Sequence, residues 1–281
     1  MSELLTSLPS TVGLYLKAAG TARRKPAGKP EIPRIATGIK ALRVDAKHLA
    51  AYRSICGFAE GETLPIVYPQ IMAQSLGIHL MTQRGFPLPL LGLVHLRNHI
   101  EQKRPLRADE VFDVSVATGE SREVGAGLEF DVVNEFSVDG DVVWRALMTV
   151  LYRVPGPKSR SRPATPAPQL AEYRAFDAPA DIGRRYAKVS GDYNPIHLTA
   201  ASAKLFGFKR AIAHGLWSMA RCCALMQSEL GAEPQSLSVQ FKQPLFLPGR
   251  VALKYLRNGD ALEYALLARN SDKVHLAGTL R

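Results

Sequence analysis

The sequence of 281 residues is poor in the residues that build metal centres and disulfide frameworks. It has only three cysteines, Cys56, Cys222 and Cys223, and their spacing is not that of a metal site. Adjacent cysteines on a helix pair poorly with each other, so all three are predicted to be reduced core residues. The seven histidines are expected to form no ligand cluster either, and we predict no metal site.

Signatures of membranes, secretion and nucleotide binding are also missing. No uninterrupted apolar run approaches the length of a membrane span. A signal peptide carries its charges before its apolar part, whereas the basic run Arg23-Arg24-Lys25 follows an apolar stretch here. No glycine motif of a nicotinamide site or a phosphate loop occurs. We therefore expect a cytoplasmic protein with no membrane span and no cofactor.

Acidic residues are fewer than basic ones, 25 against 36, which gives a formal net charge of +11. The basic residues are scattered, and no nucleic-acid-binding module is recognisable, so nucleic acid is not predicted as a partner. A basic surface of this kind favours a partner or substrate that carries phosphates or other acidic groups.

The most informative stretch covers residues 186–202. Asn194-Pro195 is a turn dipeptide, and Pro195 disfavours helical geometry at Asn194. The chain must therefore fold back within the five residues that separate Asp192 from His197. A carboxylate beside an imidazole can hold one water and move its protons, which addition or removal of water at a double bond requires.

A purely structural interpretation of this stretch stays open. Asp192 and Asn194 are typical turn formers that bond to their own backbone, and His197 could cap a helix that begins near Thr199. For an isolated Asp or His, this would be the better interpretation.

The whole string from Gly191 to His197, G-D-x-N-P-x-H, resembles the signature of the MaoC-like family of (R)-specific enoyl-thioester hydratases and 3-hydroxyacyl-thioester dehydratases. The resemblance implies a hotdog fold, in which a curved antiparallel sheet wraps a long helix. It also implies that Asp192 and His197 are the catalytic pair. Supporting roles then fall to Gly191, Asn194, which orients the turn, and Pro195, which stiffens it.

Downstream, Ala213-His214-Gly215-Leu216 opens an apolar run to Leu230 that Gly231 closes, which predicts one long buried helix. The family resemblance implies that the N–H of Gly215 points at the thioester carbonyl of the substrate. The first N–H groups of a helix are unpaired, and the helix dipole favours negative charge there. The alternative is that this glycine only allows close packing of the helix start.

Three further positions near this helix bear on the site. Related enzymes have a Ser nine residues after the helix-opening His, close to the catalytic Asp, whereas this chain has Cys223, a weaker hydrogen-bond donor. Lys209 and Arg210 are the basic residues nearest to the site in sequence and are candidate phosphate contacts. A solvated turn is the alternative for both.

The chain is about twice the length of one hotdog, and a faint internal duplication is present. Residues 52–58 align with residues 186–192 with identical spacing from Tyr to Gly, so Phe58 stands where the catalytic Asp would be. Gly57 to Tyr68 spans eleven residues, while Gly191 to His214 spans twenty-three. We predict a degenerate first hotdog that does not catalyse and that leaves room for a bulky acyl chain, with Phe58 and the segment 68–81 facing the substrate.

The predicted fold is α+β, a double hotdog. Residues 111–118, 127–138 and 141–154 have the composition of strands, with a hairpin at Asp139-Gly140. Residues 155–168 contain five prolines and no apolar periodicity, as in a linker. The predicted parts are an N-terminal extension (1–35) with a short helix over 4–19, a degenerate hotdog (36–154), a linker (155–175) and a catalytic hotdog (176–281).

Together these features predict reversible hydration of trans-2-enoyl thioesters to (R)-3-hydroxyacyl thioesters in fatty-acid metabolism. One member of the Asp192–His197 pair accepts a proton as water attacks C3, and the other delivers a proton to C2. The substrate is expected to be an acyl-CoA or acyl-carrier-protein thioester, and the protein a monomer or homodimer. The alternatives are a hotdog acyl-thioesterase and a non-catalytic acyl-thioester-binding subunit.

Overall fold

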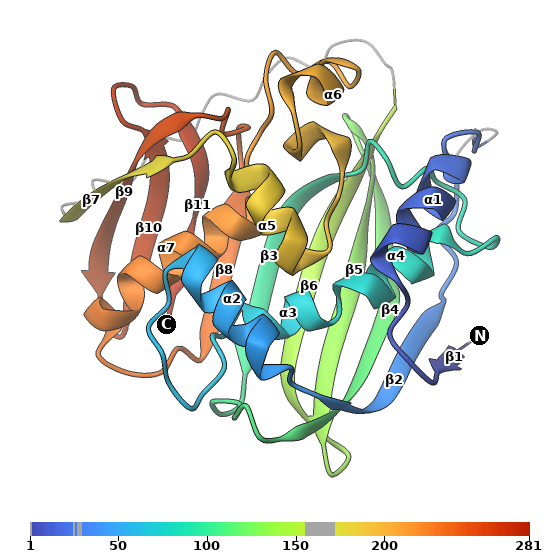
Figure 1. Cartoon of the computed structure of the whole chain (residues 1–281), viewed down its shortest axis with the longest axis horizontal. Helices are drawn as coiled ribbons and strands as arrows, with labels where there is room; N and C mark the ends of the chain where they lie inside the picture. Colours follow the sequence, from blue (N-terminus) through green and yellow to red (C-terminus); the bar gives the residue numbers. More distant parts are fainter. Residues whose placement is uncertain (1, 25, 27–29, 155–171) are drawn as a thin grey trace.

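The computed structural model describes residues 2–24, 26, 30–154 and 172–281. Within them, eleven strands form one continuous sheet in the order β1-β2-β4-β5-β6-β3-β8-β11-β10-β9-β7. The sheet is curved, and helices cover one of its faces (Figure 1). The strands are β1 (Ser2–Leu5), β2 (Ala36–Arg43), β3 (Val94–Gln102), β4 (Val111–Val124), β5 (Gly127–Val138), β6 (Asp141–Arg153), β7 (Glu172–Ala178), β8 (Ser236–Phe241), β9 (Gly249–Asn258), β10 (Ala261–Ala268) and β11 (Val274–Leu280).

The helices of the described residues differ in length between the two halves of the chain. They are α1 (Thr11–Thr21), α2 (Ala46–Cys56), α3 (Tyr68–Met72), α4 (Gln74–Thr82), α5 (Ile182–Ser190), the 3-10 turn η1 (Pro195–His197), α6 (Ala200–Lys204) and α7 (Gly215–Leu230). The predicted long helix after His214 is confirmed as α7, and Gly231 ends it in the left-handed conformation with φ 77°. The corresponding apolar segment of the first half is instead divided into α3 and α4.

The sheet order is symmetric about the β3–β8 pair. These two strands are antiparallel, with Arg97 opposite Gln240, and the strands outward from them correspond in the order β6 and β11, β5 and β10, β4 and β9. Each half lays its own helices against the sheet, α2 to α4 in one and α5 to α7 in the other (Figure 1). The predicted α+β double hotdog is therefore confirmed.

The hairpin of the first half forms where the turn residues predicted it. Asp139 and Gly140 both have positive φ, 52° and 90°, which is the backbone that a two-residue turn between twisted strands needs. The flanking strands β5 and β6 pair along their whole length, and β4 extends past the predicted end of its strand to Val124.

The N-terminal segment differs from the prediction of one helix over residues 4–19. Leu4 lies in β1, which pairs parallel to β2, and α1 begins only at Thr11. The physical reason is Pro9, which keeps the residue before it out of helical geometry. Helix α1 lies against α4 (Figure 1), so part of the segment 68–81, which was predicted to face the substrate, is covered by α1.

The predicted linker falls mostly outside the described residues, since residues 155–171 are not among them. From Glu172 the chain forms β7, the edge strand that pairs with β9. The division into an extension, two hotdogs and a linker stays a prediction at its boundaries. Among the residues that the structure describes, no helix is both long and apolar enough to cross a membrane.

Candidate active site

The predicted turn carries the acid. Helix α5 ends at Gly191, which adopts the left-handed conformation with φ 69°. The next residue, Asp192, accepts a hydrogen bond at Oδ1 from the N–H of Asn194 (3.1 Å), and the Asn194 side chain accepts one from the N–H of Ile196 (3.4 Å). Pro195 then starts the turn η1. Asp192 and Asn194 thus form the turn bonds to nearby backbone that the purely structural interpretation predicted, and these bonds also hold the Asp192 carboxylate in place.

The imidazole of His197 is held from the other side. Its Nδ1 lies 2.8 Å from the carbonyl oxygen of Ile212. Because a carbonyl only accepts, Nδ1 carries the hydrogen, which leaves Nε2 of the neutral ring with a bare lone pair. His197 does not cap the following helix, because Thr199 caps α6 through its own reciprocal bonds with Ser202. That part of the structural interpretation is wrong.

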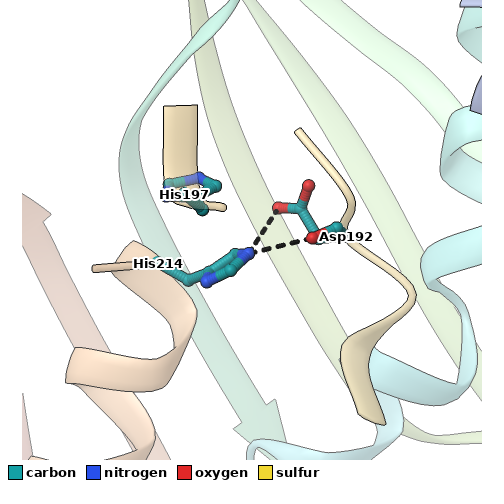
Figure 2. Close-up of side chains that lie close together, drawn as sticks. All are labelled: Asp192, His197 and His214. Carbon is teal, nitrogen blue, oxygen red and sulfur yellow. Dashed lines mark hydrogen bonds and ion pairs between the residues drawn. The ribbon is translucent and has the colours of Figure 1, made fainter. Parts of the chain in front are cut away.

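A third side chain completes the cluster. His214, directly before α7, stacks on His197 with ring centroids 3.8 Å apart and an angle of 26° between the planes. Its Nε2 lies 3.0 Å from the backbone oxygen of Asp192 and 3.9 Å from Oδ2 of the same residue (Figure 2). The sequence predicted His214 only as the residue that opens the helix, and its long-range contact with the turn was missed.

The expectation that no histidines cluster is wrong, since Asp192, His197 and His214 place one ligand-type atom each within 4.8 Å of one another. The donor chemistry nevertheless suits proton transfer better than metal binding. One nitrogen of each ring donates its hydrogen to a backbone carbonyl. The stacked rings of His197 and His214 are nearly parallel, so the lone pairs of their nitrogens lie in two separate planes. The ligands of one metal ion must instead point their lone pairs at a common centre.

Burial and mutual contact set the protonation states. Burial lowers the pKa of His214 to about 3, with a contribution from His197, while Asp192 opposes the shift. Burial also lowers the pKa of His197. For Asp192, burial alone would raise the pKa, but His214, His197 and hydrogen bonds from Tyr15 and Asn194 hold it below its usual range. At neutral pH the cluster therefore holds one carboxylate and two neutral imidazoles.

One residue from the first half contacts Asp192 and a second responds to its charge, and sequence reasoning missed both. The hydroxyl of Tyr15, in α1, lies 2.6 Å from Oδ1 of Asp192. His95, in β3, has a pKa that burial lowers to about 4 and that the charge of Asp192 partly restores. No local motif marks either residue, since Tyr15 and Asp192 are 177 positions apart in the chain.

Gly215 lies at the position that its predicted role requires, and close packing is present as well. It is the first residue of α7, and the preceding His214 makes no side-chain cap. A Cβ at this position would meet the ring of Phe241 at 3.0 Å, so a glycine fits where other residues would push that ring aside. The contact of its N–H with a substrate oxygen stays a prediction.

The remaining predicted residues lie at different distances from the turn. Cys223 is buried in α7, and burial raises the pKa of its thiol to about 12, so it stays protonated. Phe58 is buried in the core, stacked on Tyr52 with ring centroids 6.2 Å apart. Neither residue has a described contact with Asp192 or His197, and their supporting and substrate-binding roles stay predictions.

Lys209 and Arg210 are exposed, and Arg210 belongs to a small cationic cluster. The guanidinium of Arg210 and the ammonium of Lys273 lie 5.7 and 5.5 Å from the centroid of the Phe246 ring. Phe246 pairs through a β-bridge with Ile212, whose carbonyl holds His197. This cationic cluster, defined here as Arg210, Lys273 and Phe246, is thus linked to His197 through one backbone pairing.

Comparisons with known proteins identify the family of this chain. The family model described as MaoC like domain matches residues 158–265. The chain is 34% identical to 3-hydroxyacyl-thioester dehydratase X of Mycobacterium tuberculosis, over 97% of this chain and 98% of that protein. It is 28% identical to peroxisomal enoyl-CoA hydratase 2 of Arabidopsis thaliana, over 69% of each. The crystal structure of the M. tuberculosis protein HtdX superposes with a TM-score of 0.76 at 30% identity, covering 88% of this chain and 99% of that one. The chain therefore belongs to the MaoC-like dehydratase family.

Proposed function

We propose that this hydro-lyase adds water reversibly to trans-2-enoyl thioesters and gives (R)-3-hydroxyacyl thioesters in fatty-acid metabolism. The observation that carries the proposal is the buried acid–imidazole pair, Asp192 and His197, next to the start of α7. The names of the two curated relatives, a 3-hydroxyacyl-thioester dehydratase and an enoyl-CoA hydratase, support the same chemistry in both directions.

One water fits between the two groups of the pair. Both are hydrogen-bond acceptors at neutral pH, because Asp192 is ionised and Nε2 of His197 is bare. Their atoms lie within 4.8 Å of each other, a separation that a single water can bridge. If each group accepts one hydrogen of the water, a lone pair of the water oxygen is left to attack C3.

We assign the base role to His197. Nδ1 of His197 carries the hydrogen that it donates to the Ile212 carbonyl, so its Nε2 is the atom that can accept a proton. As the oxygen bonds to C3, Nε2 takes a proton and the electrons of the C2–C3 double bond move to the thioester oxygen. The imidazolium, stabilised by Asp192, then returns the proton to C2, and the other hydrogen of the water remains on the new hydroxyl. His197 thus performs both transfers in this scheme, instead of one transfer by each member of the pair, because the ionised Asp192 has no proton to deliver.

The negative charge that develops on the thioester oxygen needs a donor. The N–H of Gly215 at the start of α7 is in the position to supply one, and the helix dipole adds to the effect. No redox cofactor takes part in this scheme, because the thioester itself receives and returns the electron pair.

The carrier of the acyl group carries phosphate in this proposal, as acyl-CoA and acyl-carrier-protein thioesters both do. Arg210 and Lys273 flank the Phe246 ring beside the site, and Lys209 adds a further positive charge. Two cations around an aromatic ring suit a phosphate next to a flat base, which favours coenzyme A. We further propose a cytoplasmic monomer or homodimer with one such site per chain.

The test is an absorbance assay at the enoyl-thioester band with crotonyl, octenoyl and dodecenoyl groups on both carriers, alongside a free-thiol assay. Loss of the conjugated band without thiol release, with an (R)-3-hydroxyacyl product, supports the proposal. Thiol release would indicate a thioesterase, and binding without turnover a non-catalytic subunit. Arg210→Gln and Lys273→Gln should raise KM for the coenzyme A substrate, with the exposed Lys254→Gln as control.

A further inference from the structure

The N-terminal segment is fixed to the first half of the molecule at both of its ends. Near its start, Glu3 Oε2 lies 2.8 Å from Nε2 of His79 and accepts a bond from the Gln83 side chain (2.7 Å). Near its end, the Arg24 guanidinium donates to four backbone carbonyls at and beyond the end of α4, those of Met81, Thr82, Gln83 and Leu88. Helix α1 between these anchors is therefore held in one place over α4.

From this position α1 reaches across to the other half. The Tyr15 hydroxyl bonds to Oδ1 of Asp192, and the Tyr15 ring meets that of Tyr193 edge-on, with centroids 6.2 Å apart. The methyl group of Thr11 packs so closely on Gly191 that a Cβ added to this glycine would lie only 2.7 Å from it. The first half, which lacks a catalytic acid of its own, thus carries the helix that touches the acid of the second.

We propose that Tyr15 is a positioning residue of the hydration site, which fixes the Asp192 carboxylate so that Oδ2 alone faces the reacting water. The inference rests on the proposed hydration activity and adds to it a residue from outside the catalytic hotdog.

The hydrogen bonds around the Asp192 carboxylate support different roles for its two oxygens. Oδ1 accepts from both the Tyr15 hydroxyl and the N–H of Asn194, which occupies its lone pairs. Oδ2 is the oxygen on the side of His214, at 3.9 Å from its Nε2. The short bond from Tyr15 is of the charge-assisted kind, which is stronger and more directional than a bond between neutral groups.

Tyr15 is suited to hold the carboxylate but not to transfer protons itself. Burial, together with the adjacent charge of Asp192, raises the pKa of its phenol far above the usual value. The hydroxyl therefore keeps its hydrogen throughout the cycle. The titratable groups that contact Asp192 or respond to its charge are Tyr15 from α1, His95 from β3, Tyr186 from α5, His197 from η1 and His214 before α7.

The test is Tyr15→Phe, which keeps the ring, its contact with Tyr193 and the helix, and removes only the hydroxyl. We expect kcat to fall about 10- to 100-fold while KM for the thioester changes less than about twofold, because a bond to a charged group is lost but no substrate contact is. Asp192 loses a donor that lowers its pKa, so the acid limb of the kcat/KM profile should move to higher pH.

Two controls isolate the hydroxyl. Leu16→Ala removes a side chain that is 73% exposed on the same helix, and Tyr173→Phe removes a hydroxyl from an exposed tyrosine on β7. Both should keep the kcat and pH profile of the unmodified protein. An unchanged Tyr15→Phe would overturn the inference, and so would an increase in kcat/KM, which would mean that α1 obstructs the substrate. An unmodified protein without hydration activity would instead refute the proposed function.

Discussion

The two halves of the molecule share a scaffold and differ most in the residue that follows a capping glycine and in the segment after it. Helices α2 and α5 both end in a left-handed glycine, Gly57 with φ 78° and Gly191 with φ 69°. Tyr52 and Tyr186 lie five residues before these glycines. Their ring centroids are 6.4 Å apart, so the two helices that carry them occupy equivalent positions in the two halves.

Beyond these glycines the halves diverge. The second half continues with Asp192 and a connection that contains η1 and α6, whereas the first continues with Phe58 and a connection of half the length. From this difference we infer that the glycine cap and its helix only direct a side chain, while the acid and the imidazole of the inserted turn carry the proposed chemistry. The first half serves instead as the platform for α1.

The largest effect is expected from the residues that only the second half has. Asp192→Asn and His197→Ala should each lower the hydration rate by ~100- to 10,000-fold, because each removes one of the two groups that hold the water. Turnover at the enoyl-thioester band, together with circular dichroism to check the fold, measures this. A folded Asp192→Asn protein with nearly normal turnover would show that the two halves do not differ in the way argued here.

The reverse exchange should not create a second site. Phe58→Asp puts an acid at the equivalent position, but the short connection there has no imidazole, so titration with a tight substrate analogue should still give one site per chain. Phe58 is 8% exposed, and its loss should lower the free energy of unfolding by ~3 kcal/mol or more. Phe58→Leu, which stays apolar, is the matched control with a smaller loss. Two sites of equal affinity would contradict the degeneracy of the first half.

A smaller effect concerns acid stability. The pKa of His214 is about 3 in the folded protein, below the ordinary histidine value, so between pH 6.5 and that value the unfolded chain binds a proton that the folded chain does not. The free energy of unfolding should therefore fall as pH decreases below 6.5. His214→Gln should reduce this slope by up to ~1.4 kcal/mol per pH unit in denaturant titrations. An equal reduction by His99→Gln, at an exposed histidine, would refute the assignment to His214.

Local signals predicted much of this fold and part of its site. The hairpin at Asp139-Gly140, the glycine ends of α5 and α7 and the turn from Asp192 to His197 depend on short-range geometry, which neighbouring residues specify. The start of α1 is also specified locally, because Pro9 excludes a helix that begins at Leu4 and continues through it. The contacts of His214 and Tyr15 with Asp192 depend on packing between distant segments, and no periodicity or spacing encodes them.

The central β3–β8 pair has a consequence for how this protein can be altered. Where identical chains assemble around a two-fold axis, every substitution occurs on both sides of that axis. Here the strands flanking the approximate axis belong to one covalent chain, so position 58 can change while position 192 does not. A protein engineer could therefore vary position 58 of the first half without changing the residues of the proposed site, a freedom that a symmetric pair of hotdogs does not offer.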